Sequence, residues 1–134
     1  MNFADDKAKS DVVLDREIAL DQLDGDTETL AMLLDLFSTD APTTMDMIRS
    51  AVGANNPAAL RSTAHKIKGS LSVLGAPAAM QVALKLETMG RTGNMQDAPA
   101  TFAALERELA RLYPELTQFA SELRQSKSKP QKKV

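Results

Sequence analysis

The sequence predicts an all-α fold, an antiparallel up-down four-helix bundle with an accessory N-terminal helix. Apolar residues recur at steps of three and four along most of the 134 residues, which is the period of a helix and not of a strand. Ala and Leu are abundant, β-branched residues are sparse, and Pro or Gly stands at the borders of the periodic segments. Long helices joined by short connections favour antiparallel neighbours in a bundle.

One domain accounts for the length. The chain is 43% hydrophobic and 25% charged, a balance typical of a globular protein. We expect the bundle to occupy residues 11–124. Residues 1–10 are predicted to be a flexible N-terminus. Residues 125–134 are polar and contain four Lys, which predicts a disordered basic tail.

The first two helical segments are separated by Gly25. Residues 11–23 carry a short apolar stripe made by Val13, Leu14, Ile18 and Leu23. The second segment begins at Asp26 or Thr27, and its apolar positions are Leu30, Leu33, Leu34, Phe37, Ala41, Met45, Ile48 and Val52. Pro42 interrupts it and either kinks one long helix or divides it in two. Because the stripe keeps its phase through the proline, we favour one kinked helix.

The third helical segment has the clearest borders. Asn56 is a good helix cap, and Pro57 suits the first helical position. The segment then runs over residues 57–74 and ends at Gly75, a residue type that commonly terminates helices.

Two further helices complete the prediction. Pro77 opens the fourth segment, which reaches about Met89. Gly90 and Gly93 then mark a loop over residues 91–97. Pro99 opens the fifth, and Pro114 should bend it. Its stripe consists of Phe102, Leu105, Leu109, Leu112, Leu116, Phe119 and Leu123.

Composition excludes several kinds of chemistry. The chain has no Cys, which excludes disulfides, thiolate metal sites and a cysteine nucleophile, and its one histidine, His65, excludes a multi-histidine metal site. We therefore expect no metal site and no cofactor of its own. The net charge of −2 argues against nucleic-acid binding. With neither a signal peptide nor a membrane-spanning segment in evidence, we expect a cytoplasmic protein. We also expect a monomer, because one bundle of this size can bury its own core.

His65 lies on the polar side of the third segment. The apolar face of that segment consists of Leu60, Ala64, Ile67, Leu71 and Leu74. A second stripe, well over a right angle away, consists of His65, Lys68, Gly69 and Ser72. The imidazole therefore points to solvent from the middle of a helix, with Arg61 and Lys66 nearby.

The spacing of His65, Lys68 and Gly69 suits phosphorylation by a docked protein. An exposed neutral imidazole is a competent nucleophile. Lys68 can neutralise an anion placed on it, and a glycine in a helix interior leaves room for another protein to approach. Singly, an exposed His is an ordinary surface residue, a helical Gly a close-packing site and a Lys a solvated charge. Their combination favours the functional interpretation.

The same residues resemble a known signature. His65-Lys66-Ile67-Lys68-Gly69-Ser70, followed by Leu74-Gly75-Ala76, is similar to the motif of histidine-containing phosphotransfer (HPt) domains. Similarity over residues 11–123 extends to Leu23-Asp24-Gly25-Asp26, Leu33-Leu34, Phe37, Asp40-Ala41-Pro42, Leu60-Arg61, Ala64 and Leu86-Glu87. Leu71 departs from the small residue often found there. The resemblance implies a four-helix bundle with His65 as phosphoacceptor, Lys68 as the motif lysine and Gly69 as the motif glycine.

The resemblance also implies a place in a multistep His–Asp phosphorelay. The phosphoryl group would come from a receiver-domain phosphoaspartate, pass to His65 and leave to another receiver aspartate. The expected partners are response-regulator receiver domains and a hybrid sensor histidine kinase, with Mg²⁺ supplied by the receiver. The chain has no phosphate-binding glycine loop, so we expect a phosphocarrier without ATP-dependent kinase activity.

The sequence leaves two other classes of protein to be weighed. A phosphorylation-independent helical adaptor would use the bundle for docking alone. A carboxylate-bridged metal bundle would need Glu-x-x-His pairs, but Ser62 stands three residues before the one histidine.

For docking near His65, the candidates are Met80, Ala83, Leu84 and the first helical segment, with core packing as the more ordinary interpretation for most of them. Glu87 is expected to pair with a base on a neighbouring helix, and Ser70 and Ser72 to lie on the surface.

Overall fold

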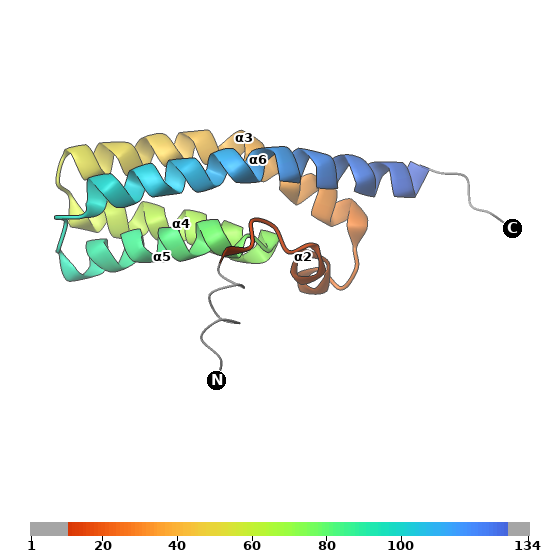
Figure 1. The fold of residues 1–134 in the computed structure, drawn as a ribbon, viewed down its shortest axis with the longest axis horizontal. Helices are drawn as coiled ribbons and strands as arrows, with labels where there is room; N and C mark the ends of the chain where they lie inside the picture. Colours follow the sequence, from red (N-terminus) through yellow and green to blue (C-terminus); the bar gives the residue numbers. More distant parts are fainter. Residues whose placement is uncertain (1–10, 129–134) are drawn as a thin grey trace, which may run out of the picture.

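The computed structural model describes residues 11–128, and over that range it consists of helices without strands. The helices are α2 (Arg16–Gln22), α3 (Thr27–Gly53), α4 (Pro57–Leu74), α5 (Pro77–Thr92) and α6 (Ala98–Ser128). The last four form an antiparallel bundle in which α3 packs beside α6 and α4 beside α5 (Figure 1). α2 lies at the end where α3 and α6 extend past the other two helices. The predicted fold class and its accessory N-terminal helix are confirmed.

The core is built from the apolar stripes of the four long helices. α4 contributes Leu60, Ala64, Ile67, Leu71 and Leu74, and each is at most 2% exposed. All seven apolar residues predicted for the stripe of α6 are also buried. Burial of a Leu or Phe side chain stabilises a fold by about 1.5–3 kcal/mol, so the stripes determine which face of each helix points inward.

α3 passes through Pro42 as one helix, as the unbroken phase of its stripe predicted. Asp26 caps its first turn, where the carboxylate accepts a hydrogen bond from Thr29 N at 3.1 Å. α4 has the predicted borders as well. The Asn56 side chain accepts from Ala59 N at 3.1 Å, and Gly75 ends the helix in the left-handed conformation at φ +76°.

The N-terminal helix is shorter than the predicted 11–23, because the residues before Arg16 bind the α4–α5 turn instead. Asp15 N donates to Gly75 O at 2.6 Å, and Ala78 N donates to Val12 O at 3.0 Å. These bonds use backbone groups that a helix would pair internally. Asp15 then caps α2, and Ala19 takes the buried position in place of Ile18, which is 40% exposed.

α5 extends to Thr92, three residues beyond its predicted end at Met89. Gly90, predicted to open a loop, is helical and buried. A Cβ added to Gly90 would lie 2.7 Å from both Arg61 Cα and Pro57 O. The glycine therefore marks the place where the α5 backbone packs directly on the first turns of α4. The helix ends at Gly93, at φ +80°.

α6 begins at Ala98 and continues to Ser128, so residues 125–128 of the predicted disordered tail are helical. No helix breaker occurs between Arg124 and Pro130, and proline disfavours helical geometry in the residue before it. The rest of the predicted tail, 129–134, and the predicted flexible N-terminus, 1–10, lie outside the described residues.

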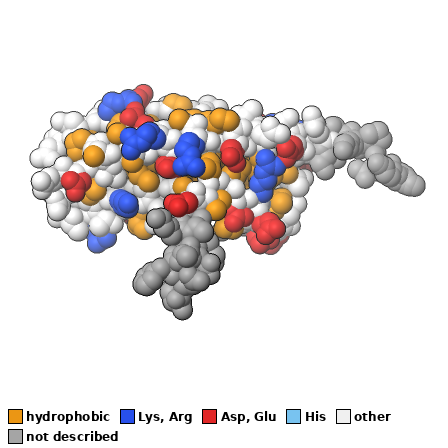
Figure 2. Space-filling model, in the orientation of Figure 1, with side chains coloured by type: hydrophobic (Ala, Val, Ile, Leu, Met, Phe, Trp, Pro, Cys, Tyr) orange, Lys and Arg blue, Asp and Glu red, His pale blue; other side chains and the backbone are white. Residues whose placement is uncertain are grey.

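The surface of the bundle carries mixed charge. On the face shown in Figure 2, Lys and Arg side chains are interspersed with Asp and Glu side chains and with apolar residues. Over residues 11–128, the helices lack the long apolar stretch that crossing a membrane requires.

Replacing Gly90 by alanine is expected to destabilise the bundle. The added methyl group would meet backbone atoms of α4 that cannot move aside, and overpacking of this kind costs about 1–3 kcal/mol. Gly69→Ala is the matched control, since nothing lies within 4 Å of a Cβ added there. Its higher helix propensity should stabilise the fold by about 0.5–1 kcal/mol. Urea unfolding measures both changes, and equal effects would contradict the packing assigned to Gly90.

Candidate functional site

His65 lies at the middle of α4 on the side opposite its core face. Its side chain is 67% exposed, whereas Ala64 and Ile67 beside it are 0% and 2% exposed. His65 therefore faces solvent, as the helical period predicts. Because α4 is packed along its whole length, the imidazole is presented by a rigid element rather than by a loop.

Glu87 of α5 binds both His65 and Lys68. Its Oε2 atom lies 2.7 Å from His65 Nδ1, and its Oε1 atom lies 2.7 Å from Lys68 Nζ. His65 and Lys68 are three residues apart on α4, so they project from the same side of that helix. The Glu87 side chain is 16% exposed, and Lys68 is the cation that faces its buried Oε1 atom.

The charge of Glu87 decides which ring nitrogen of His65 carries the proton. The hydrogen bond from Lys68 lowers the pKa of Glu87 below its ordinary value near 4.5, burial opposes this, and His65 lowers it further. Glu87 is therefore ionised at neutral pH, and an ionised carboxylate only accepts hydrogen bonds. Nδ1 must carry the proton that is donated to Glu87. In the neutral ring the lone pair is then on Nε2, the nitrogen that Glu87 does not bind.

Gly69 leaves open space next to the histidine. No atom outside its own helix backbone lies within 4 Å of the position that a Cβ would take. The glycine therefore has no packing function inside the bundle, in contrast to Gly90. Any group that uses this space must come from outside the bundle.

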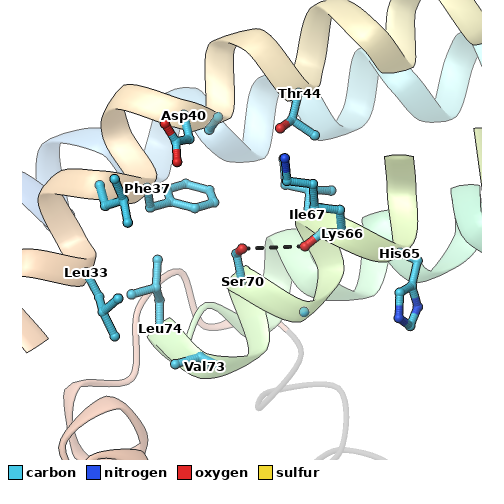
Figure 3. A pocket seen from close by; sticks show the side chains of 13 residues that line it. Leu33, Phe37, Asp40, Thr44, His65, Lys66, Ile67, Ser70, Val73 and Leu74 are labelled. Atoms are coloured by element: carbon cyan, nitrogen blue, oxygen red, sulfur yellow. Dashed lines mark hydrogen bonds between the residues drawn. The ribbon is translucent and has the colours of Figure 1, made fainter. Parts of the chain in front are cut away.

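A groove between α3 and α4 begins beside His65. It has a volume of about 520 Å³, and its apolar lining includes Leu33, Leu36, Phe37, Ile67, Val73 and Leu74. Leu36 is 50% exposed and Val73 is 37% exposed, so this lining is open to solvent. Figure 3 shows the His65 ring at the edge of the groove, pointing away from Phe37 and Leu74.

The other residues singled out from the sequence fall into two groups. Ala83 is fully buried and Met80 packs against the core, which leaves Leu84, at 38% exposed, as the accessible apolar residue of the three on α5. Ser70 and Ser72 lie on the surface as expected. Within residues 11–128 no cluster of three or more His, Cys, Asp or Glu could hold a metal ion.

The sequence does not predict the contact between Glu87 and His65. An ion pair of Glu87 with a base on a neighbouring helix was predicted, and Lys68 is that base. The contact of Glu87 with His65 depends on how α5 is positioned along α4. The periodicity of one helix gives no information about that position. The available signal was the spacing of Leu86-Glu87 relative to the histidine motif.

Comparison with known proteins gives one consistent result. The family model for the Hpt domain matches residues 32–126. HptB, a histidine-containing phosphotransfer protein from Pseudomonas aeruginosa PAO1, has 30% sequence identity and a TM-score of 0.76, with 82% of this chain and 96% of HptB covered. The HPT domain of an Hpt sensor hybrid histidine kinase from Shewanella has 25% identity and a TM-score of 0.58, covering 89% of this chain and 97% of that domain. No curated protein matches the sequence.

Glu87→Gln should weaken the acid dependence of stability. A carboxyl whose pKa is lowered by folding stabilises the protein above its unfolded value near 4.5, and that stability is lost as the pH falls through the folded value. The free energy of unfolding of the wild type should therefore decrease more between pH 6 and pH 3 than that of Glu87→Gln. Urea unfolding across this range is the measurement, and parallel curves for the two proteins would contradict the ion pair.

Proposed function

The chain belongs to the Hpt domain family of phosphocarriers, and on this premise we propose that His65 accepts a phosphoryl group from a receiver-domain phosphoaspartate and passes it to another receiver aspartate. One observation carries the proposal. The His65 side chain is 67% exposed on a rigid helix, and Glu87 binds Nδ1, so the lone pair of the neutral ring is on Nε2, which Glu87 does not contact. This is the arrangement that a nucleophile needs if its reaction partner is another protein.

The transfer requires no proton to leave the ring. The Nε2 lone pair forms a bond to phosphorus, the bond between phosphorus and the aspartate oxygen breaks, and the carboxylate leaves with the electron pair. The ring keeps its Nδ1 proton and becomes a phosphoryl imidazolium next to the Glu87 carboxylate. Attack by a second receiver carboxylate reverses these steps and returns a neutral ring.

Lys68 and Gly69 assist this transfer in different ways. The Lys68 ammonium has three donors on a flexible stem, so it can reach the oxygens of a phosphoryl group on Nε2. Gly69 offers the open space that a receiver needs to bring its aspartate close to the ring. The apolar groove that starts beside His65, together with the exposed Leu84, would provide the docking surface.

The receiver would supply the rest of the reaction centre. Acyl phosphate chemistry on an aspartate uses Mg²⁺, and the proposed source of that ion is the acidic pocket of the partner. The chain then contributes the nucleophile, the orientation of that nucleophile and a docking surface. The proposed upstream donor is the receiver of a hybrid sensor histidine kinase, and the carrier acts in the cytoplasm as a single bundle.

His65→Gln should abolish labelling by a phosphorylated receiver, because glutamine has no nucleophilic ring nitrogen. The wild type should acquire an acid-labile, base-stable label, which is the stability expected of phosphohistidine. Ser72→Ala, one of the exposed hydroxyl positions on the same side of α4, should label normally. Transfer that persists in His65→Gln would overturn the assignment. A helical adaptor would instead bind the receiver in both forms and accept label in neither.

Gly69→Leu should slow transfer by about tenfold or more, since a displacement of about 1 Å at a reacting centre can cost 100-fold. Gly53→Leu is the matched control, because Gly53 is also helical and exposed and has nothing within 4 Å of an added Cβ. Both variants should keep wild-type helicity by circular dichroism. Stopped-flow transfer from a labelled receiver separates them, and equal rates would show that the space at Gly69 is not used.

A further inference from the structure

We propose that Glu87 is a positioning residue that competes with the phosphoryl group for Lys68 and thereby limits how long His65 stays phosphorylated. This inference rests on the proposed function. It concerns a contact already present in the unphosphorylated protein, where the Lys68 ammonium is bound to Glu87 and not free beside the imidazole.

The Glu87 carboxylate contacts two side chains of α4. Oε2 of Glu87 is 2.7 Å from Nδ1 of His65, and Oε1 is 2.7 Å from Nζ of Lys68. Glu87 comes from α5, and both of its partners come from α4. Its side chain is the more buried of the two in each pair, at 16% exposed against 67% for His65 and 26% for Lys68. Glu87 therefore stays in place while Lys68, on a flexible four-carbon stem, can exchange partners.

Phosphorylation changes the charges on both sides of Glu87. The N–P bond makes the ring an imidazolium, because the Nδ1 proton is retained, and this strengthens its attraction to Oε2. The phosphoryl oxygens carry up to two negative charges and attract Lys68 away from Oε1. Lys68 can therefore bind either the Glu87 carboxylate or the phosphoryl group on His65.

Both effects of Glu87 shorten the lifetime of the phosphoryl group. The Glu87 carboxylate accepts the hydrogen bond of the Nδ1 proton, so the N–P bond can break with its electron pair going to Nε2 and a neutral imidazole as the leaving group. The same carboxylate withdraws Lys68 from the phosphoryl oxygens, which leaves their charge less neutralised. When water is the attacking group, the products are inorganic phosphate and the neutral ring with its Nδ1 proton.

Hydrolysis of the phosphorylated protein in the absence of any receiver tests this competition. The intact chain is phosphorylated with phosphoramidate, a small N–P donor that releases ammonia, and the decay of phosphohistidine is followed by ³¹P NMR. Glu87→Gln retains an oxygen that can accept from Nδ1 but loses the negative charge. We expect its phosphohistidine to last about two- to fivefold longer than that of the wild type, the range for a partly exposed ion pair.

Lys68→Ala and the double variant complete the test. Lys68→Ala should shorten the lifetime of phosphohistidine relative to the wild type. The double variant should outlast Lys68→Ala by a smaller factor than that by which Glu87→Gln outlasts the wild type, because the cation for which Glu87 competes is absent. A lifetime in Glu87→Gln equal to or shorter than that of the wild type overturns the proposal while leaving the phosphocarrier function intact. A wild type that takes no phosphoryl group from phosphoramidate or from a phosphorylated receiver overturns both.

Discussion

The close packing of α5 on α4 at Gly90 is the constraint on which the site depends. A side chain at that position would collide with the backbone at Arg61 and Pro57, so glycine sets the distance between the two helices. Glu87 lies three residues earlier on α5 and is brought within 2.7 Å of both His65 and Lys68 by the same packing. A wider spacing would leave the histidine exposed but without the carboxylate that orients it.

α4 combines two functions that usually compete. Its core face, with Leu60 and Leu71 fully buried, holds the helix in the bundle, while the opposite side carries an imidazole in solvent. A functional group on a loop would be accessible to a partner, but its position would be less well defined. On α4, accessibility comes from the helical period and rigidity from the buried stripe. The caps at Asn56 and Gly75 fix both ends of the helix, so the position of His65 along the bundle is determined as well.

The site supplies an oriented nucleophile, and a partner protein would have to supply the rest of the reaction centre. One carboxylate orients the imidazole and holds the nearest cation, and the adjoining surface has a groove with exposed apolar residues and an open space at Gly69. Membership in a family of phosphocarriers agrees with this arrangement. A carrier must bind a phosphoryl group well enough to hold it and weakly enough to release it. In the proposed competition, sharing Lys68 between Glu87 and the phosphoryl group would be a physical means to that balance.

The order of the helical segments, their buried stripes, the borders of α4 and the exposed side on which His65, Lys68 and Gly69 lie could all be predicted from the sequence. These features follow from local rules, namely the period of the helix and the residues that cap its ends. Only the tertiary structure decided that Gly90 packs against α4 while Gly69 faces open space, since both appear in the sequence as glycines near helical segments. It also decided that the chain before Arg16 binds the α4–α5 turn, and that Glu87 reaches the histidine. Those outcomes depend on the distance and relative positions of separate helices, and the periodicity of one helix carries no information about its neighbours.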